Sequence, residues 1–334
     1  MTDTVTTIKN KIDFKQILQK YGIVFVLILM IIGISIAEPA FLSRSNIFNV
    51  LTQSSIFGIM ALGLTFVIIS KGIDLSVGSI LALSGVVLAS LGQAASATSK
   101  FYPNLGELPV FVPILAALAI GALCGGISGA LIAKTRIPAF IATLGMMTIA
   151  RGMALIYSDG RPVSTLVPSL TALGGKLFGY IPVPVIIFFI AIVVSSILLQ
   201  MTKFGKNVYA IGGNITAAEV SGVNVSKNLI MIYAYSGLLA GLAAVVFAGR
   251  VGSVHPGAAT GYELTAIAAT TIGGTSHAGG IGTIWGAFVG ALVLAVMRNG
   301  LTLMGVDAYW QQITEGVIII VAVVIDMRKN AKKD

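Results

Sequence analysis

The stretch SSIFGIMALGLTFVIIS, residues Ser54–Ser70, decides the fold class of this chain. It contains no charged side chain, and an uncharged apolar run of this length is typical of a helix that crosses a lipid bilayer. The chain as a whole is 56% hydrophobic and only 10% charged, whereas soluble domains carry about 25% charged residues. A water-soluble fold could not hide so much apolar surface, so the composition indicates an integral membrane protein.

Apolar runs of the same kind recur along the chain and predict an all-α membrane protein with about ten transmembrane helices. The predicted spans are Gly22–Ala37, Ser54–Ser70, Leu75–Ala95, Pro109–Ala133, Ala139–Tyr157, Ile181–Gln200, Asn228–Ala248, Tyr262–Gly274, Thr283–Met304 and Val306–Asp326. The run 262–274 is too short for about 30 Å of hydrocarbon, which predicts a discontinuous or re-entrant helix. Residues 22–327 are thus expected to form one transmembrane domain between the tails 1–21 and 328–334.

The basic residues indicate how the spans are oriented, because Lys and Arg gather in the cytoplasmic loops of membrane proteins. The loops and span ends placed outside hold only Arg44, Lys100, Arg161, Lys176, Arg250 and Arg298. The segments placed inside hold Lys9, Lys11, Lys15, Lys20, Lys71, Lys134, Arg136, Lys203, Lys206, Lys227, Arg328, Lys329, Lys332 and Lys333. This asymmetry predicts that both termini are cytoplasmic. It also accounts for the net charge of +9 without a nucleic-acid partner.

Two sets of glycines mark an internal repeat. Gly121, Gly125 and Gly129 are followed by Ala-Leu, and so are Gly282, Gly286 and Gly290, each 161 residues after its counterpart. Small residues at four-residue spacing let two helix backbones approach closely in a membrane. The two sets fall on the fourth and ninth spans, which run in opposite directions. The pattern therefore predicts an inverted repeat that relates spans 2–5 to spans 7–10, an arrangement that transporters often use around the substrate path.

No motif in the chain indicates an enzyme. The sequence contains no G-x-x-x-x-G-K-[ST] phosphate loop and no H-E-x-x-H motif, and its one cysteine, Cys124, lies in an apolar run. The two histidines, His255 and His277, lie in glycine-rich turns without an evident partner. No catalytic residue, metal site or cofactor is expected in this chain.

The longest inside segment, 201–227, contains a Gly-Gly-Asn turn at 212–214 followed by small residues. This pattern favours a short surface helix. Asn214 follows two glycines and is predicted to be the N-cap of that helix. One interpretation is a docking element for a soluble motor, and the other is a solvated connecting loop. The residues assigned to the docking interpretation are Gly212, Gly213, Asn214, Ala217, Ala218, Glu219, Ser221 and Gly222.

Four polar residues in or beside predicted spans are candidates for the pathway or its gate: Asp74, Ser76, Glu263 and Asn299. For Asp74 the favoured interpretation is the N-cap of the third span, where a carboxylate favours the positive end of the helix dipole. Arg151 and Glu315 are also ionisable groups of the membrane region, and such groups mark functional sites by default. The alternative for these two is snorkelling to the membrane surface.

The segments Gly72–Ser79, Phe140–Gly145, Lys203–Val225 and Tyr262–Gly282 resemble the permease subunits of bacterial monosaccharide ABC importers of the ribose, galactose, xylose and arabinose type. The resemblance covers the chain from Phe41 to Asp326. It implies a bacterial plasma (inner) membrane permease that pairs with a second permease subunit in a homodimer. It also implies a periplasmic or lipid-anchored sugar-binding protein, and a separate ATPase that docks on the loop between the sixth and seventh spans and carries ATP and magnesium.

The resemblance favours ribose without settling the sugar. The run Gly72–Ser79 is similar to ribose permeases, whereas Ala308–Gln311 is similar to galactoside permeases. A self-sufficient secondary transporter is the alternative from another class, and it would need a coupling site built from Asp74, Glu263 and Glu315. A membrane enzyme is disfavoured because no set of catalytic residues is clustered along the chain.

Overall fold

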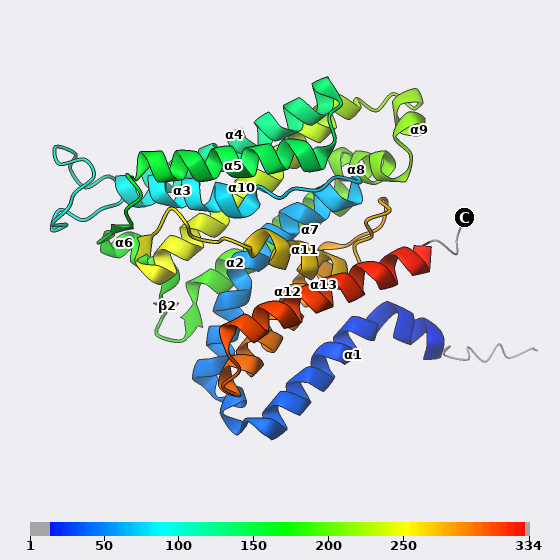
Figure 1. The fold of residues 1–334 in the computed structure, drawn as a ribbon, viewed down its shortest axis with the longest axis horizontal. Coiled ribbons are helices and arrows are strands. Elements are labelled where there is room, and N and C mark those ends of the chain that lie inside the picture. The colour runs from blue at the N-terminus through cyan, green and yellow to red at the C-terminus, as the bar shows by residue number, and fades with distance from the viewer. Residues whose placement is uncertain (1–13, 331–334) are drawn as a thin grey trace, which may run out of the picture.

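The computed structural model describes residues 14–330, which form a bundle of helices with four very short strands (Figure 1). The long helices are α1 (Phe14–Ala37), α2 (Arg44–Ile69), α3 (Val77–Leu91), α4 (Phe111–Thr135), α5 (Ala139–Tyr157), α7 (Val183–Met201), α8 (Lys203–Gly213), α10 (Val225–Val251), α11 (Tyr262–Ile272), α12 (Ile284–Leu303) and α13 (Ala308–Asn330). The short elements are η1 (Pro39–Leu42), α6 (Pro168–Thr171), η2 (Ala172–Gly174) and α9 (Ile215–Val220), with β1 (Val163–Ser164) paired to β4 (Ser253–Val254) and β2 (Lys176–Leu177) paired to β3 (Ile181–Pro182).

The prediction of an all-α, multi-span membrane protein is confirmed. Seven of the described helices are long and apolar enough to cross a membrane: α2, α4, α5, α7, α10, α12 and the part of α13 from Ala308 to Arg328. The apolar part of α1, Gly22–Ala37, and helix α3 are shorter. Helix α11 has only 11 residues, as the short run 262–274 predicts.

Several predicted boundaries differ from the structure. Helix α2 begins ten residues before the predicted span, because Ser43 caps it by accepting a hydrogen bond from the Asn46 N–H. The predicted third span, 75–95, is too long, since α3 covers only Val77–Leu91. Helix α1 already starts at Phe14, within the predicted tail 1–21, and α13 runs on to Asn330. The remaining tail residues, 1–13 and 331–334, lie outside the described part of the chain.

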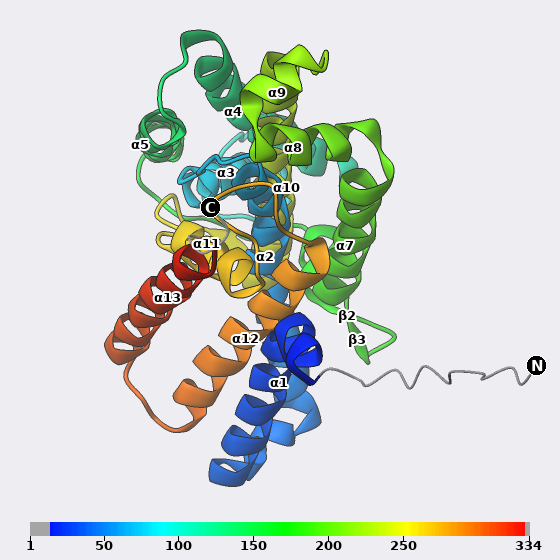
Figure 2. The ribbon, with the colours of Figure 1, turned by 90° about the vertical axis from the view of Figure 1, so that its right-hand side faces the viewer.

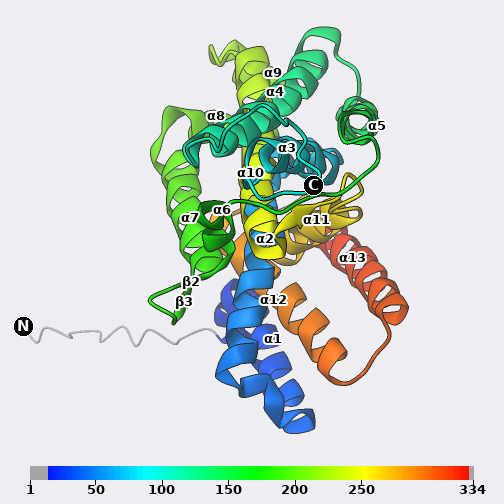
Figure 3. The same cartoon turned by 90° about the vertical axis from the view of Figure 1, so that its left-hand side faces the viewer.

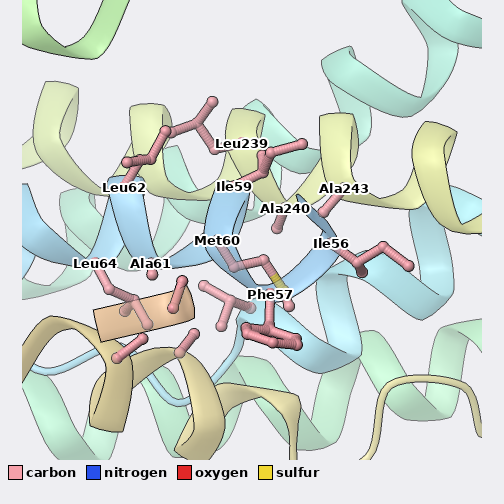
Figure 4. Close-up of a cluster of buried hydrophobic side chains, with 14 of the residues drawn as sticks. Ile56, Phe57, Ile59, Met60, Ala61, Leu62, Leu64, Leu239, Ala240 and Ala243 are labelled. Atoms are coloured by element: carbon pink, nitrogen blue, oxygen red, sulfur yellow. The ribbon is translucent and has the colours of Figure 1, made fainter. Parts of the chain in front are cut away.

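Helices α2 and α10 form the centre of the bundle, with α1, α5, α7 and α13 around them (Figures 2 and 3). Every residue of α2 from Ser54 to Ile69 is buried. Figure 4 shows Ile59 and Met60 of α2 packed beside Ala240 and Ala243 of α10. The stretch that decides the fold class is therefore a helix surrounded by protein rather than by lipid.

The two halves of the chain exchange partners. Helices α3 and α4 pack on α10, which belongs to the other half, while α11 and α12 pack on α2. Helix α5 then lies beside α3, and α13 beside α11. This reciprocal packing is the arrangement expected of the repeat that relates spans 2–5 to spans 7–10.

The repeated glycines lie where helix backbones meet. Gly121, Gly125 and Gly129 of α4 face α10, and a Cβ on Gly125 would overlap the carbonyl oxygen of Tyr233. In the other set, Gly286 and Gly290 of α12 face the end of α11, and Gly282 approaches the Ile69 side chain. Since packing rather than hydrophobic exclusion drives helix association in lipid, these contacts hold α4 to α10 and α12 to α11.

Helix α1 begins and α13 ends on the right-hand side of Figure 1, where α8 and α9 also lie. We call this side the α9 end of the bundle. Helix α6 lies at the opposite side, which we call the α6 end. The ends of α1 and α13 that the structure describes thus share one side, as an even number of crossings requires.

Candidate functional site

Two helices begin inside the bundle instead of at its ends. At 1.5 Å per residue, α3 and α11 are only about 22 and 16 Å long, against about 30 Å of hydrocarbon. The segment after α3 bonds to residues near α6, since the Val167 N–H donates to Gly92 O at 2.9 Å. The loop after α11 bonds to the last residue of α2, since the Gly280 N–H donates to Ile69 O at 2.8 Å. The two helices therefore lead to opposite ends of the bundle.

The beginnings of these two half-helices meet. A Cβ on Gly78, at the start of α3, would collide with the carboxylate of Glu263 and the carbonyl oxygen of Ala259. Only glycine allows this approach. Half-helices whose N-terminal ends converge within a bundle are typical of the substrate and coupling region of transporters. Three of the four predicted candidates lie at this junction: Asp74 and Ser76 at the start of α3, and Glu263 in the first turn of α11.

Asp74 is fully buried and binds three donors. Its Oδ1 accepts hydrogen bonds from the N–H of Ser76 at 2.9 Å and from its Oγ at 2.5 Å, and its Oδ2 accepts one from Ser236 Oγ of α10 at 2.9 Å. The N-cap of α3 is Ser76, not Asp74, so the N-cap interpretation of Asp74 is wrong. The carboxylate instead fastens the extended segment between α2 and α3 to the middle of α10.

Glu263 and Arg151 organise the chain that leads into α11. Glu263 Oε1 accepts a hydrogen bond from the Gly261 N–H at 3.2 Å, while its Oε2 is buried without a hydrogen-bond partner in the described structure. Arg151 of α5 donates to the carbonyl oxygens of Pro256 and Ala258 at 2.7 and 2.8 Å. Arg151 therefore links α5 to the chain before α11.

A cavity of about 520 Å³, lined by both polar and apolar residues, lies between α2, α11, α12 and α13. Its lining includes an ion pair in which Arg298 Nη2 lies 2.5 Å from Glu315 Oε2. Arg298 also donates to Thr265 Oγ1 at 2.8 Å. Glu315 is buried, so its snorkelling interpretation is wrong. Arg298 lies in the last two turns of α12, near the end of the predicted span, and faces its partner on α13.

Asn299 does not join these groups. It forms two amide hydrogen bonds with Asn46, at 2.8 and 2.9 Å, and so holds α12 to the start of α2. Within residues 14–330 no three His, Cys, Asp or Glu side chains come together as a metal site requires.

At the α9 end, the segment 201–227 forms α8 and α9. Asn214 caps α9, since its Oδ1 accepts a hydrogen bond from the Ala217 N–H at 3.0 Å, which confirms the predicted N-cap. The exposed residues of this turn and helix include Gly213, Asn214, Ala217, Glu219, Ser221 and Gly222. Val220 exposes 85% of its surface. Ile215 is also exposed, so the α9 surface presents two apolar side chains among small and polar residues.

Two residues of the predicted docking set do not face outward. Ala218 is only 4% exposed because it packs against Ile211 and Val225. Gly212 is buried, and a Cβ there would overlap the carbonyl of Ile69. These two residues support the segment from within. Their burial corrects the prediction that they belong to the contact surface.

Helix α8 is bonded to the segment after α2 and to the loop between α11 and α12, since Tyr209 of α8 donates to Gly282 O at 2.7 Å. Lys71 Nζ donates to Gly213 O at 3.4 Å, next to the end of α2. The loop between α11 and α12 reaches α13, because the N–H of His277 and the Oγ of Ser276 donate to Asp326 Oδ2 at 3.0 and 3.1 Å. Local sequence does not predict this junction, because its bonds join residues from distant parts of the chain.

Comparisons with known proteins find matches along nearly the whole chain. A family model described as "Branched-chain amino acid transport system / permease component" matches residues 46–323. The ribose import permease protein of Escherichia coli strain K12 is 41% identical over 98% of this chain and 100% of its own length. That of Bacillus subtilis strain 168 is 42% identical over 99% of both chains. The galactose/methyl galactoside import permease protein of Escherichia coli strain K12 is 41% identical over 97% of this chain and 98% of its own. No solved structure was found to match.

Proposed function

The chain belongs to the family of transport-system permease components that matches residues 46–323, and from this we propose that it is the membrane-spanning permease of an ATP-driven monosaccharide importer. It is a multi-pass protein of the inner membrane. Ribose is the proposed sugar. The observation that carries this proposal is the 41–42% identity to ribose import permeases over nearly the full length. Galactose is the second candidate, because a galactose/methyl galactoside permease is equally similar.

The energy source is proposed to be a separate ATPase subunit, which binds ATP and magnesium. The α9 segment supports this role, because a capped surface helix with an exposed apolar residue, Val220, suits a protein partner. The bonds between α8, Lys71 and the loop 273–283 supply a route by which movement of α9 could reach α2 and α13. With α9 inside, the ends of α1 and α13 also lie on the cytoplasmic side.

A second copy of this chain is proposed to cover the side that carries α5 and α13. Both helices lie at the periphery on the same side of the bundle (Figures 2 and 3). Tyr309, Trp310 and Ile313 of α13 are all more than half exposed, as are Ile149 and Ile156 of α5. A sugar-binding protein would deliver the sugar at the α6 end.

Within the pathway, Asp74, Ser76 and Glu263 are proposed as gate-positioning residues. Asp74 and Ser76 join the start of α3 to α10, and Glu263 at the start of α11 lies against Gly78 of α3. A rigid-body movement of one half against the other would have to change these contacts. Asn299 is not retained in this set, because its side chain is held by Asn46.

Uptake in cells tests the substrate. A strain without endogenous ribose uptake is given this chain together with its ATPase and its binding protein, and entry of radiolabelled ribose is measured. We expect uptake that excess unlabelled ribose abolishes and excess leucine does not. Competition by galactose alone would select the second candidate, and competition by leucine alone would contradict a sugar permease.

A further inference from the structure

The cavity between α2, α11, α12 and α13 has the size of a small-molecule site. Its volume of about 520 Å³ falls in the range of about 300–1,000 Å³ that ligand pockets occupy. It lies near the end of α12 and the start of α13, on the side of the bundle away from α9. Gly261 and Tyr262, at the start of α11, belong to its lining, so the cavity adjoins the half-helix junction.

The lining is rich in groups that both donate and accept hydrogen bonds. Glutamines come from two elements, Gln53 from α2 and Gln311 and Gln312 from α13, and the hydroxyls of Thr260, Tyr262 and Thr302 stand among them. Amides and hydroxyls can pair with any orientation of a ligand hydroxyl. A buried polar group needs a partner, and part of this lining has one within the protein: Gln311 donates to Thr302 Oγ1 at 3.2 Å, and Thr260 donates to Gly257 O at 2.9 Å.

The charges of the lining cancel. Arg298 and Glu315 are the charged residues of the cavity, and they form an ion pair with each other. A site for an anion would need unmatched positive charge. The cavity instead suits a ligand without net charge.

One acceptor of this pair is unused. Glu315 exposes only 10% of its side chain, and its Oε1 is buried without a hydrogen-bond partner in the described residues. An unpaired buried carboxylate oxygen costs more than a paired one. A ligand hydroxyl is a donor that would satisfy it without adding charge.

We propose that this cavity is a transport subsite for an uncharged polyhydroxyl ligand, a monosaccharide, in which the Glu315 carboxylate accepts hydroxyl hydrogens beside Arg298 and the α13 glutamines. The inference rests on the proposed function and adds the place where the sugar is held. It further separates sugars from amino acids as the cargo, since the charged ends of an amino acid would have to break the Arg298–Glu315 pair to find partners.

The test uses the whole importer in lipid vesicles, with Cys124 replaced by alanine, and the variant Gln312→Cys. Gln312 is exposed and lines the cavity, so a polar thiol reagent should modify the introduced cysteine. We expect ribose to slow the modification several-fold and leucine to leave it unchanged. The control Asp159→Cys lies in an exposed loop outside the cavity, and ribose should not protect it.

Kinetics supply the second measurement. Glu315→Gln keeps the side-chain size but removes a charged acceptor, whose hydrogen bond contributes about 1.5–3 kcal/mol. The KM for ribose should therefore rise about tenfold or more. Gln312→Leu leaves the ion pair intact and should raise KM as well. The control Asp159→Asn breaks an exposed ion pair with Arg161 and should not change KM.

The outcomes separate this inference from the proposed function. ATP-driven ribose uptake by the unmodified importer, together with a Gln312→Cys variant that ribose does not protect or that never reacts, would overturn the subsite alone. Protection by leucine and by no sugar would also overturn it. Absence of any ATP-driven sugar uptake by the unmodified importer would overturn the proposed function itself.

Discussion

Ser236, in the middle of α10, donates a hydrogen bond to Asp74 at 2.9 Å, and both residues are completely buried. Their link spans 162 positions of the chain and joins the two halves of the repeat. It holds the start of α3 at the depth at which α11 also begins. The discontinuous helices are thus fixed by a polar contact and not by apolar packing alone.

Removal of this donor should loosen the bundle. Hydrogen bonds to charged groups contribute about 1.5–3 kcal/mol, so Ser236→Ala should lower the free energy of unfolding by about that amount. Thermal unfolding of the detergent-solubilised protein measures it. Ser195→Ala is the matched control, because Ser195 is equally buried but bonds the neutral Tyr235 hydroxyl at 2.7 Å. Equal losses for both variants would contradict a special role of Asp74.

The Arg298–Glu315 pair should show strong coupling in a double-mutant cycle. Breaking a buried ion pair by removing one partner costs about 3–5 kcal/mol, whereas replacing both with apolar residues is often neutral. Arg298→Met and Glu315→Leu should each destabilise the protein, and the double variant should recover most of the loss. Additive losses in thermal unfolding would show that the pair is not a unit.

Substitutions at the exposed and the buried side of α9 should differ in their effect on stability. Val220→Glu places a charge on the exposed surface, so we expect loss of ATPase co-purification and of uptake with unchanged thermal stability. Ala218→Leu should destabilise α9 itself, because Ala218 packs on Ile211 and Val225. Phe178→Glu, at an exposed residue between β2 and β3, is the control for Val220→Glu. If Val220→Glu binds the ATPase as well as Phe178→Glu does, α9 is not the docking helix.

Two adjacent glycines of α4 should differ in their tolerance of a methyl group. A Cβ on Gly125 would overlap the Tyr233 carbonyl, whereas a Cβ on Gly126 has its nearest neighbour, Ala234 Cβ, at 3.7 Å. Overpacking of a tight contact costs about 1–3 kcal/mol. Gly125→Ala should therefore lower the unfolding temperature, and Gly126→Ala should not. The reverse order would refute the packing of α4 on α10.

The loop between α11 and α12 should respond to acid through His277. Burial lowers the pKa of His277, an effect that the nearby Asp326 carboxylate opposes. A lowered folded-state pKa means that the unfolded chain binds the proton more readily, so this stabilisation is present above about pH 6.5 and is lost as the pH falls. Lowering the pH from about 7.5 to 5.5 should therefore reduce the free energy of unfolding of the native chain more than that of the His277→Gln variant. Parallel pH profiles would contradict this.

Much of the fold follows from local sequence. Uncharged runs predict where the long helices lie, and the Gly-Gly-Asn sequence predicts the cap of α9, because these signals depend on neighbouring residues. The Gly121 and Gly282 sets indicate the repeat. The end of α3 at Leu91 could not be predicted, since the next residue, Gly92, is bonded by the N–H of Val167, which is distant in the chain.

The candidate site was predicted only in part. Asp74 and Glu263 were found because carboxylates are rare in membrane spans, and the same signal pointed to Glu315. Their partners were not found, because Ser236 and Arg298 are identified only when the helices are packed. Ala218 shows the opposite error: a small residue suits either a docking surface or a tight core, and only burial distinguishes the two.

The most direct test of the account is the energy source of transport. Vesicles that contain this chain with its ATPase and binding protein are loaded with ATP and magnesium, and sugar accumulation is measured against vesicles loaded with a non-hydrolysable nucleotide. We predict accumulation against a gradient only with ATP hydrolysis, and none by this chain alone under a proton or sodium gradient. Accumulation by the chain alone, driven by either ion, would contradict the assignment as the permease subunit of an ATP-driven importer.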